Sequence, residues 1–225
     1  MKHQLAYVRA WLRGNRYRDP AQVHAPDAGH PPVLLLHGFL GTRGGMYLLE
    51  RRLVGEGFTV LSYPLGALNT GSIIRSAERV ASRVERLLRS AGVARLDVVA
   101  HSMGGLIALY YIRNLGGSSR VRRLVALGTP WSGTWVAGLG AATFGLASPG
   151  TWQLLPGHPL LRALREGPLP PEVRITSIRG AADRICPLPR THLPGARNVV
   201  LPVDHAGLVT SERAWLAVRG FLLDP

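Results

Sequence analysis

Short apolar runs alternate with amphipathic segments along most of this chain. The longest amphipathic segment, 72–90, has apolar residues at intervals of three and four, which is the period of a helix with one buried face. Ser72 and Gly92 flank it as helix-start and helix-stop residues. The apolar runs lack strict alternation, which is typical of strands in a parallel sheet covered on both faces.

These patterns predict an α/β fold with a sheet of about six mostly parallel strands and helices on both faces. The predicted strands cover 33–37, 58–61, 96–100, 121–127, 173–178 and 198–203. The predicted helices cover 46–54, 72–90, 104–112, 135–146, 160–165 and 207–222.

Two stretches do not follow this alternation. Residues 1–32 form a basic N-terminal segment with a proline-rich lead-in, and one domain occupies 33–225. Within that domain, 131–171 is rich in Gly, Ala, Pro, Trp and Leu and contains no clear strand. We interpret 131–171 as a helical cap or lid over an acyl-binding pocket; the alternative is an insertion that completes the core.

Composition indicates a globular protein, with 46% apolar and 18% charged residues. The formal net charge of +14 favours anionic surfaces or substrates, although a codon bias toward arginine would give the same excess. The arginines are scattered and not interleaved with aromatic residues, so we expect no nucleic-acid partner. A membrane or lipid-droplet surface is a candidate partner.

The first eighteen residues carry charges throughout and lack the uninterrupted apolar stretch of a secretory signal peptide. We therefore expect a cytoplasmic protein; membrane association or secretion by a non-standard route are the alternatives. The start of the chain also suggests a short basic amphipathic helix that either lies on a membrane or docks on the body. Its apolar residues among the arginines are Leu5, Tyr7, Val8, Trp11 and Leu12. The single cysteine, Cys186, excludes an intrachain disulfide.

The residues Ala100-His101-Ser102-Met103-Gly104 lie between a predicted strand and a predicted helix. A serine at the apex of such a turn is typical of a nucleophile elbow. Small residues are required two positions before and after the serine, where the strand and helix crowd the turn. Gly104 meets this requirement, and Ala100 adds one methyl group. The alternative is a serine that only caps the helix.

A serine nucleophile requires a base and an orienting acid, which in such folds follow it in the order acid, then histidine. His205 follows the last predicted strand, whereas the competing His192 lies between two strands. Asp183 follows the strand 173–178 at the edge of the sheet where catalytic residues collect. Asp204 is adjacent to His205 and points away from it, and Asp97 lies at the wrong end of its strand.

The oxyanion hole requires two backbone N–H groups. Met103 follows the serine and supplies one, and the loop His37-Gly38-Phe39 after the first strand supplies Phe39 for the other. No phosphate-binding or dinucleotide motif is present, and no side chains have metal-ligand spacing. We therefore expect neither cofactor nor metal, and interpret Cys186 as a buried small residue.

The elbow, the stretch Leu109-Tyr110-Tyr111-Ile112-Arg113-Asn114-Leu115 and the segments around Asp183 and His205 resemble the small secreted lipases of bacilli. That family also has alanine at the position of Ala100. The resemblance covers most of 33–210. It implies a minimal α/β-hydrolase that cleaves acylglycerol esters without a cofactor, with Ser102 as nucleophile, Asp183 as acid, His205 as base, and Phe39 and Met103 as oxyanion donors.

The chain departs from that family in lacking a signal peptide and in the length of 131–171, and Gly128-Thr129-Pro130 resembles a stretch of larger lipases and esterases. The sequence thus predicts a serine hydrolase of lipid or small esters that works through an acyl-enzyme. An acyltransferase with the same residues and a non-catalytic lipid-binding protein of this fold are the alternatives.

Overall fold

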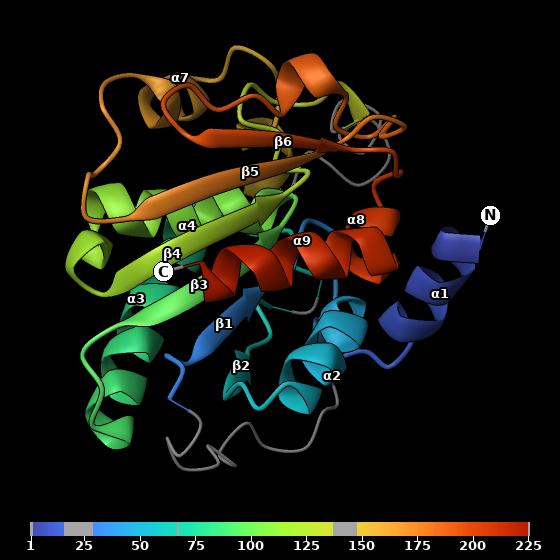
Figure 1. Ribbon diagram of the computed structural model, residues 1–225. Coiled ribbons are helices and arrows are strands. Elements are labelled where there is room, and N and C mark those ends of the chain that lie inside the picture. Colours follow the sequence, from blue (N-terminus) through green and yellow to red (C-terminus); the bar gives the residue numbers. More distant parts are fainter. Residues whose placement is uncertain (1, 16–28, 67, 137–147, 225) are drawn as a thin grey trace.

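The computed structural model describes residues 2–15, 29–66, 68–136 and 148–224, which form one parallel sheet with helices on both faces (Figure 1). The strand order is β2-β1-β3-β4-β5-β6, and every neighbouring pair is parallel. The strands are β1 (Val33–Leu36), β2 (Val60–Ser62), β3 (Leu96–His101), β4 (Val121–Leu127), β5 (Arg174–Gly180) and β6 (Arg197–Leu201). The predicted fold class and all six predicted strands are confirmed.

Two apolar cores lie on opposite faces of the sheet, because alternate strand residues point to opposite sides. The helices α3 (Ile73–Ala91), α4 (Met103–Asn114) and α7 (Pro159–Arg165) cover one face. The other face is covered by α2 (Tyr47–Gly55), α8 (Gly207–Thr210) and α9 (Glu212–Leu223). The remaining described helices are α1 (Lys2–Trp11), α6 (Pro149–Gln153) and 3₁₀ turns at Arg43–Met46, Gly117–Ser119 and Leu188–Arg190.

Most helix predictions are confirmed to within two residues, including the left-handed Gly92 (φ 64°) that ends α3. The single helix predicted over 207–222 is wrong. Ser211 is extended (φ −76°, ψ 154°) and divides it into α8 and α9, and its hydroxyl accepts the Ala214 N–H to cap α9. A capping serine within an apolar periodic stretch is the signal that marks this break.

The described parts of 131–171 are joined firmly to the core. The N–H of Ile73 at the start of α3 donates to the Gln153 side chain at 2.7 Å, and Leu161 and Leu164 of α7 are buried against α4. The helix predicted over 135–146 lies almost wholly outside the described residues. A cap over the serine therefore stays a prediction.

Within the ranges given above, no helix is both long and apolar enough to cross a membrane.

Candidate active site

Ser102 stands at the carboxyl end of β3, in the turn that leads into α4. Its backbone has φ 54° and ψ −126°, a conformation that costs a non-glycine residue about 1–3 kcal/mol. The Ser102 N–H donates to the Leu127 carbonyl on β4 at 2.8 Å, which holds the turn in register with the sheet. Backbone strain kept in this way is typical of a functional residue.

The turn is possible because its neighbours are small. A Cβ on Gly104 would lie 2.5 Å from the Leu36 carbonyl oxygen on β1, and Ala100 is fully buried. A Cβ on Gly105 would lie 2.0 Å from Oγ1 of Thr129, whose hydroxyl donates to the Ser102 carbonyl at 3.0 Å. The sequence predicted the need for small residues at 100 and 104 but missed the support from Thr129.

The loop after β1 approaches Ser102 closely. A Cβ on Gly38 would lie 2.7 Å from Ser102 Cβ and 3.3 Å from its Oγ, so only glycine fits there. Phe39, the expected second oxyanion donor, directly follows Gly38 in this loop. Met103 begins α4, where a helix leaves its first N–H groups free for an anion.

Two buried side chains fix this loop, and sequence reasoning missed both roles. The Asn69 amide donates to the carbonyls of His37 (3.0 Å) and Gly38 (3.2 Å). The His37 ring donates from Nδ1 to the Gly38 carbonyl at 3.2 Å and accepts the Leu65 N–H at Nε2. Burial lowers the pKa of His37 to about 4, so the ring is neutral at pH 7 and fills both roles.

Asp183 and His205 meet at the carboxyl ends of β5 and β6. Asp183 Oδ2 accepts from Nδ1 of His205 at 2.7 Å, and the carboxylate is fully buried. Asp183 Oδ1 accepts the backbone N–H groups of Ile185 (2.9 Å) and Cys186 (2.8 Å). Gly128 (φ 58°) lies beneath the pair, since a Cβ there would be 3.2 Å from both bonded atoms.

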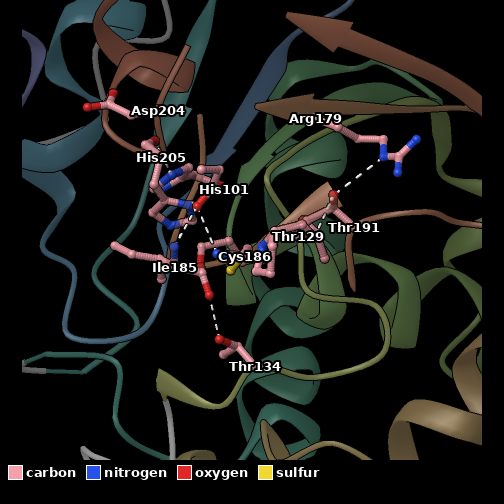
Figure 2. A network of polar contacts seen from close by, with 12 residues as sticks. His101, Thr129, Thr134, Arg179, Ile185, Cys186, Thr191, Asp204 and His205 are labelled. Carbon is pink, nitrogen blue, oxygen red and sulfur yellow. Dashed lines mark hydrogen bonds and ion pairs between the residues drawn. The ribbon is translucent and has the colours of Figure 1, made fainter. Parts of the chain in front are cut away.

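His101, directly before the serine, supports His205 from beneath. Its ring lies 4.5 Å from the His205 ring, and its Nε2–H donates to the His205 carbonyl at 3.2 Å (Figure 2). Full burial, and then the neighbouring His205, hold the pKa of His101 well below its ordinary value. The neutral ring is thus a hydrogen-bond donor and a packing partner. The motif drew attention to Ser102 and gave no signal for this neighbour.

Cys186 lies against the same group of side chains. Its Sγ is within 4.8 Å of ligand atoms of Asp183 and His205, and its thiol shares a hydrogen bond with Ser102. Burial, and then the charge of Asp183, raise the pKa of this thiol well above its ordinary value. These are also the atoms with which a metal ion would have to be held, but a metal-binding thiol must first lose its proton. Of these atoms, Nδ1 of His205 and Oδ2 of Asp183 are already bonded to each other.

The rejected candidates lie elsewhere. Asp204 Oδ1 accepts the Gly207 N–H at 2.7 Å, which closes a turn, and its side chain points away from the His205 ring (Figure 2). His192 is exposed. Asp97 is buried at the start of β3, where it pairs with Arg122.

The loop after β4 is fastened to the loop that carries Asp183. The Thr134 hydroxyl donates to the Ile185 carbonyl (Figure 2). Trp131, which is fully buried, donates from Nε1 to the Ser177 hydroxyl on β5 at 3.0 Å. The first bond joins this loop to the loop that carries Asp183, and the second joins it to β5, the strand that precedes Asp183.

A strained serine after the third strand and an Asp–His pair after the last two, on one edge of a parallel sheet, define an α/β-hydrolase. Residues 31–152, more than half of the chain, match the family model described as "alpha/beta hydrolase fold". The chain therefore belongs to the alpha/beta-hydrolase fold family.

Solved structures agree with this membership. The mature lipase BlEst2 of Bacillus licheniformis is similar with a TM-score of 0.75 and 16% identity, over 89% of this chain and 95% of that one. Lipase B of Aspergillus fumigatus has a TM-score of 0.74 and 21% identity, over 88% of this chain and 54% of that one. The expected likeness to a bacillus lipase is thus confirmed at the level of the fold.

One curated protein, named "Putative carbamate hydrolase RutD" in Klebsiella pneumoniae, is 35% identical over 89 residues. The matched segment covers 38% of this chain and 33% of the relative. The chain thus aligns with a third of this relative's length, which supports a hydrolase of this family and leaves the bond it cleaves open.

Proposed function

We propose that this protein is a serine hydrolase that cleaves carboxylic esters through an acyl-enzyme. Ser102 Oγ attacks the ester carbonyl, and His205 takes the serine proton as general base. Because the Nδ1–H of His205 is directed to Asp183, the ring's other nitrogen, Nε2, is left unprotonated for this task. Asp183 holds that tautomer and stabilises the imidazolium that forms.

The N–H groups of Phe39 and Met103 stabilise the negative charge that develops on the carbonyl oxygen. His205 then protonates the departing alcohol, and a water molecule activated by the same ring releases the acid from Ser102. Nothing in this sequence of steps requires a group beyond the chain's own residues and water.

The observation that carries the proposal is the 2.7 Å bond between Asp183 and His205 at the same edge of the sheet as the strained Ser102. A serine that only caps α4 would accept an N–H from the helix, and no such side-chain bond from Ser102 is present. A serine that only caps the helix would also leave the bond between the buried Asp183 carboxylate and His205 unexplained.

Hydrolysis of nitrophenyl esters of increasing acyl length tests this function. We expect turnover of at least one ester by the wild-type chain and a loss on the order of 10⁶-fold in Ser102→Ala. A preference for long acyl chains identifies a lipase, and a preference for short chains an esterase. Undiminished turnover in Ser102→Ala would overturn the proposal.

Two additions to the same assay separate the neighbouring reactions. A nitrophenyl carbamate, whose carbonyl is open to the same attack, tests the activity in the name of the matched relative. A primary alcohol added as acceptor shows whether the acyl group passes to water or to alcohol. Predominant transfer at low alcohol concentration would favour the acyltransferase over the hydrolase.

A further inference from the structure

The outward face of α1 is apolar, which is the reverse of the usual arrangement on a surface helix. Leu5, Val8 and Leu12 are 55%, 48% and 69% exposed. The Leu12 N–H donates to the Val8 carbonyl at 2.9 Å, so the helical geometry continues to Leu12. At about 100° per residue the three side chains fall within an arc of about 60°. We call these three residues the α1 stripe.

The opposite face of α1 is fixed to the body of the protein, so the stripe cannot turn inward. Tyr7 lies 6.1 Å from the His101 ring, and Ala10 is buried. A Cβ on Gly44 would lie 2.3 Å from the Ala10 carbonyl oxygen, which shows how closely the helix packs. Figure 1 shows α1 beside α8, where His3 contacts Thr210.

Positive charge flanks one side of the stripe. Lys2, Arg9 and Arg13 are exposed, and the first acidic residue in the sequence is Asp19. Arg9 and Arg13 also line a groove between α1 and α2, where an anionic group would meet both guanidinium groups. A helix with an apolar stripe and flanking cations is suited to lie in the headgroup region of an anionic bilayer.

We propose that α1 docks this protein on an anionic lipid surface, with the stripe among the acyl chains and the flanking cations on the headgroups. A second copy of the chain fits the stripe poorly, because each helix would bring three cations against the other three. The net charge of +14 opposes self-association in the same way and favours a negatively charged bilayer.

The docked helix would bring the edge that holds Ser102 toward the lipid. Trp11 donates from Nε1 to the Leu40 carbonyl at 2.8 Å, and Leu40 directly follows Phe39 in the loop beside the serine. Leu40 is itself 40% exposed, so it adds a fourth exposed apolar side chain on the side of the stripe that leads to the site. Substrates dissolved in the bilayer would then reach the site without crossing water.

Co-sedimentation with vesicles tests the proposal, using phosphatidylcholine alone and phosphatidylcholine mixed with phosphatidylglycerol. We expect binding to the mixed vesicles only, weakened by added salt. Leu5→Gln/Val8→Gln should weaken this binding at least about tenfold. Lys2→Gln/Arg9→Gln should weaken it about fivefold per cation.

The chain offers matched controls for both pairs. Val54→Gln/Leu216→Gln replaces a valine and a leucine that are 54% and 56% exposed on α2 and α9. Arg75→Gln/Arg79→Gln removes two exposed cations from α3. Both control pairs should bind mixed vesicles as the wild type does, and circular dichroism and thermal unfolding establish that every variant is folded.

Failure of the wild type to bind mixed vesicles, or equal binding by the stripe pair and the wild type, would overturn the proposal. It would also be overturned if sedimentation velocity showed a dimer that the stripe pair dissolves while vesicle binding stays unchanged. Because sedimentation records binding and not turnover, its failure would leave the proposed hydrolase activity untouched.

Discussion

Asp183 and His205, 22 positions apart in the sequence, share a 2.7 Å bond from Nδ1–H to Oδ2. The carboxylate is inaccessible to solvent, and its other oxygen is held by two backbone N–H groups. The aspartate therefore has one orientation, and it gives the imidazole one orientation too. The predictions below follow from how the surrounding residues hold this pair and the serine.

Asp183→Asn should lower kcat about 10⁴-fold with little change in KM, because an amide can turn its NH₂ toward Nδ1 and stabilise the wrong tautomer. Steady-state kinetics on a nitrophenyl ester measures this. Asp204→Asn is the matched control, since Asp204 precedes His205 and only closes a turn. A similar loss in both variants would contradict the assignment of the acid.

His101 should act as a positioning residue for His205. His101→Phe keeps a ring beside His205 but removes the donor to its carbonyl, so we expect a lower kcat, an unchanged KM and retained stability. His101→Ala removes both contacts and should lose more kcat than His101→Phe. A loss shared equally between kcat and KM, or one that simply follows thermal stability, would point to a general structural role instead.

His37 should make stability depend on pH. Its pKa is 6.5 ordinarily and about 4 in the fold, so below pH 6.5 the unfolded chain takes up a proton that the folded chain refuses. The contribution of neutral His37 to the free energy of unfolding is therefore fully present above pH 6.5. It is lost as the pH falls toward 4, and the loss amounts to at most about 3 kcal/mol. His101 acts in the same direction.

Urea unfolding between pH 7.5 and pH 4, which spans the ordinary pKa of His37 and its pKa of about 4 in the fold, measures this dependence. His37→Gln lowers stability throughout but removes one titrating ring, so its free energy of unfolding should fall less steeply with acid than that of the wild type. Parallel slopes for the two proteins would show that His37 is not held neutral.

Gly105→Ala should destabilise the fold by about 1–3 kcal/mol, because the new methyl group meets Thr129 Oγ1 at 2.0 Å. Thr129 cannot withdraw without losing its bond to the Ser102 carbonyl. Adding Thr129→Ala removes the hydroxyl and should restore part of the lost stability. The recovery should be incomplete, because Cβ of residue 129 remains and would lie 2.9 Å from the new methyl group. Thermal unfolding of the single and double variants measures the coupling.

Gly220→Ala in α9 is the control for that experiment. Nothing lies within 4 Å of a Cβ at Gly220, so the substitution should raise stability by about 0.5–1 kcal/mol through helix propensity alone. A stabilising effect at both glycines would mean that the contact between Gly105 and Thr129 is looser than the structure indicates.

The sheet was predictable from sequence because each strand is a short apolar run between turn residues, and all six lie within about two residues of their predicted bounds. Ser102, Asp183 and His205 could be identified from the sequence as candidates, because parallel strands bring their carboxyl ends to one edge of the sheet. The expected need for a small residue at position 104 agrees with the structure, where a Cβ on Gly104 would lie 2.5 Å from the Leu36 carbonyl oxygen.

The residues that hold the site in place could not be identified from the sequence in the same way. Asn69 reaches the loop after β1 from 31 positions away, and nothing in the residues around it indicates that contact. His101 was visible within the motif, but its contact with His205 spans 104 positions. Such support depends on the final packing of distant loops, whereas strand periodicity and turn chemistry are local.

Labelling with a fluorophosphonate, followed by peptide mass spectrometry, tests the central claim most directly. The reagent reacts with a serine only when a base and an oxyanion hole activate it. We expect one adduct per chain on the peptide that contains Ser102, slower labelling in Asp183→Asn and His205→Ala, and none in Ser102→Ala. An unlabelled wild-type chain, or an adduct on another serine, would contradict the assignment of Ser102, Asp183 and His205.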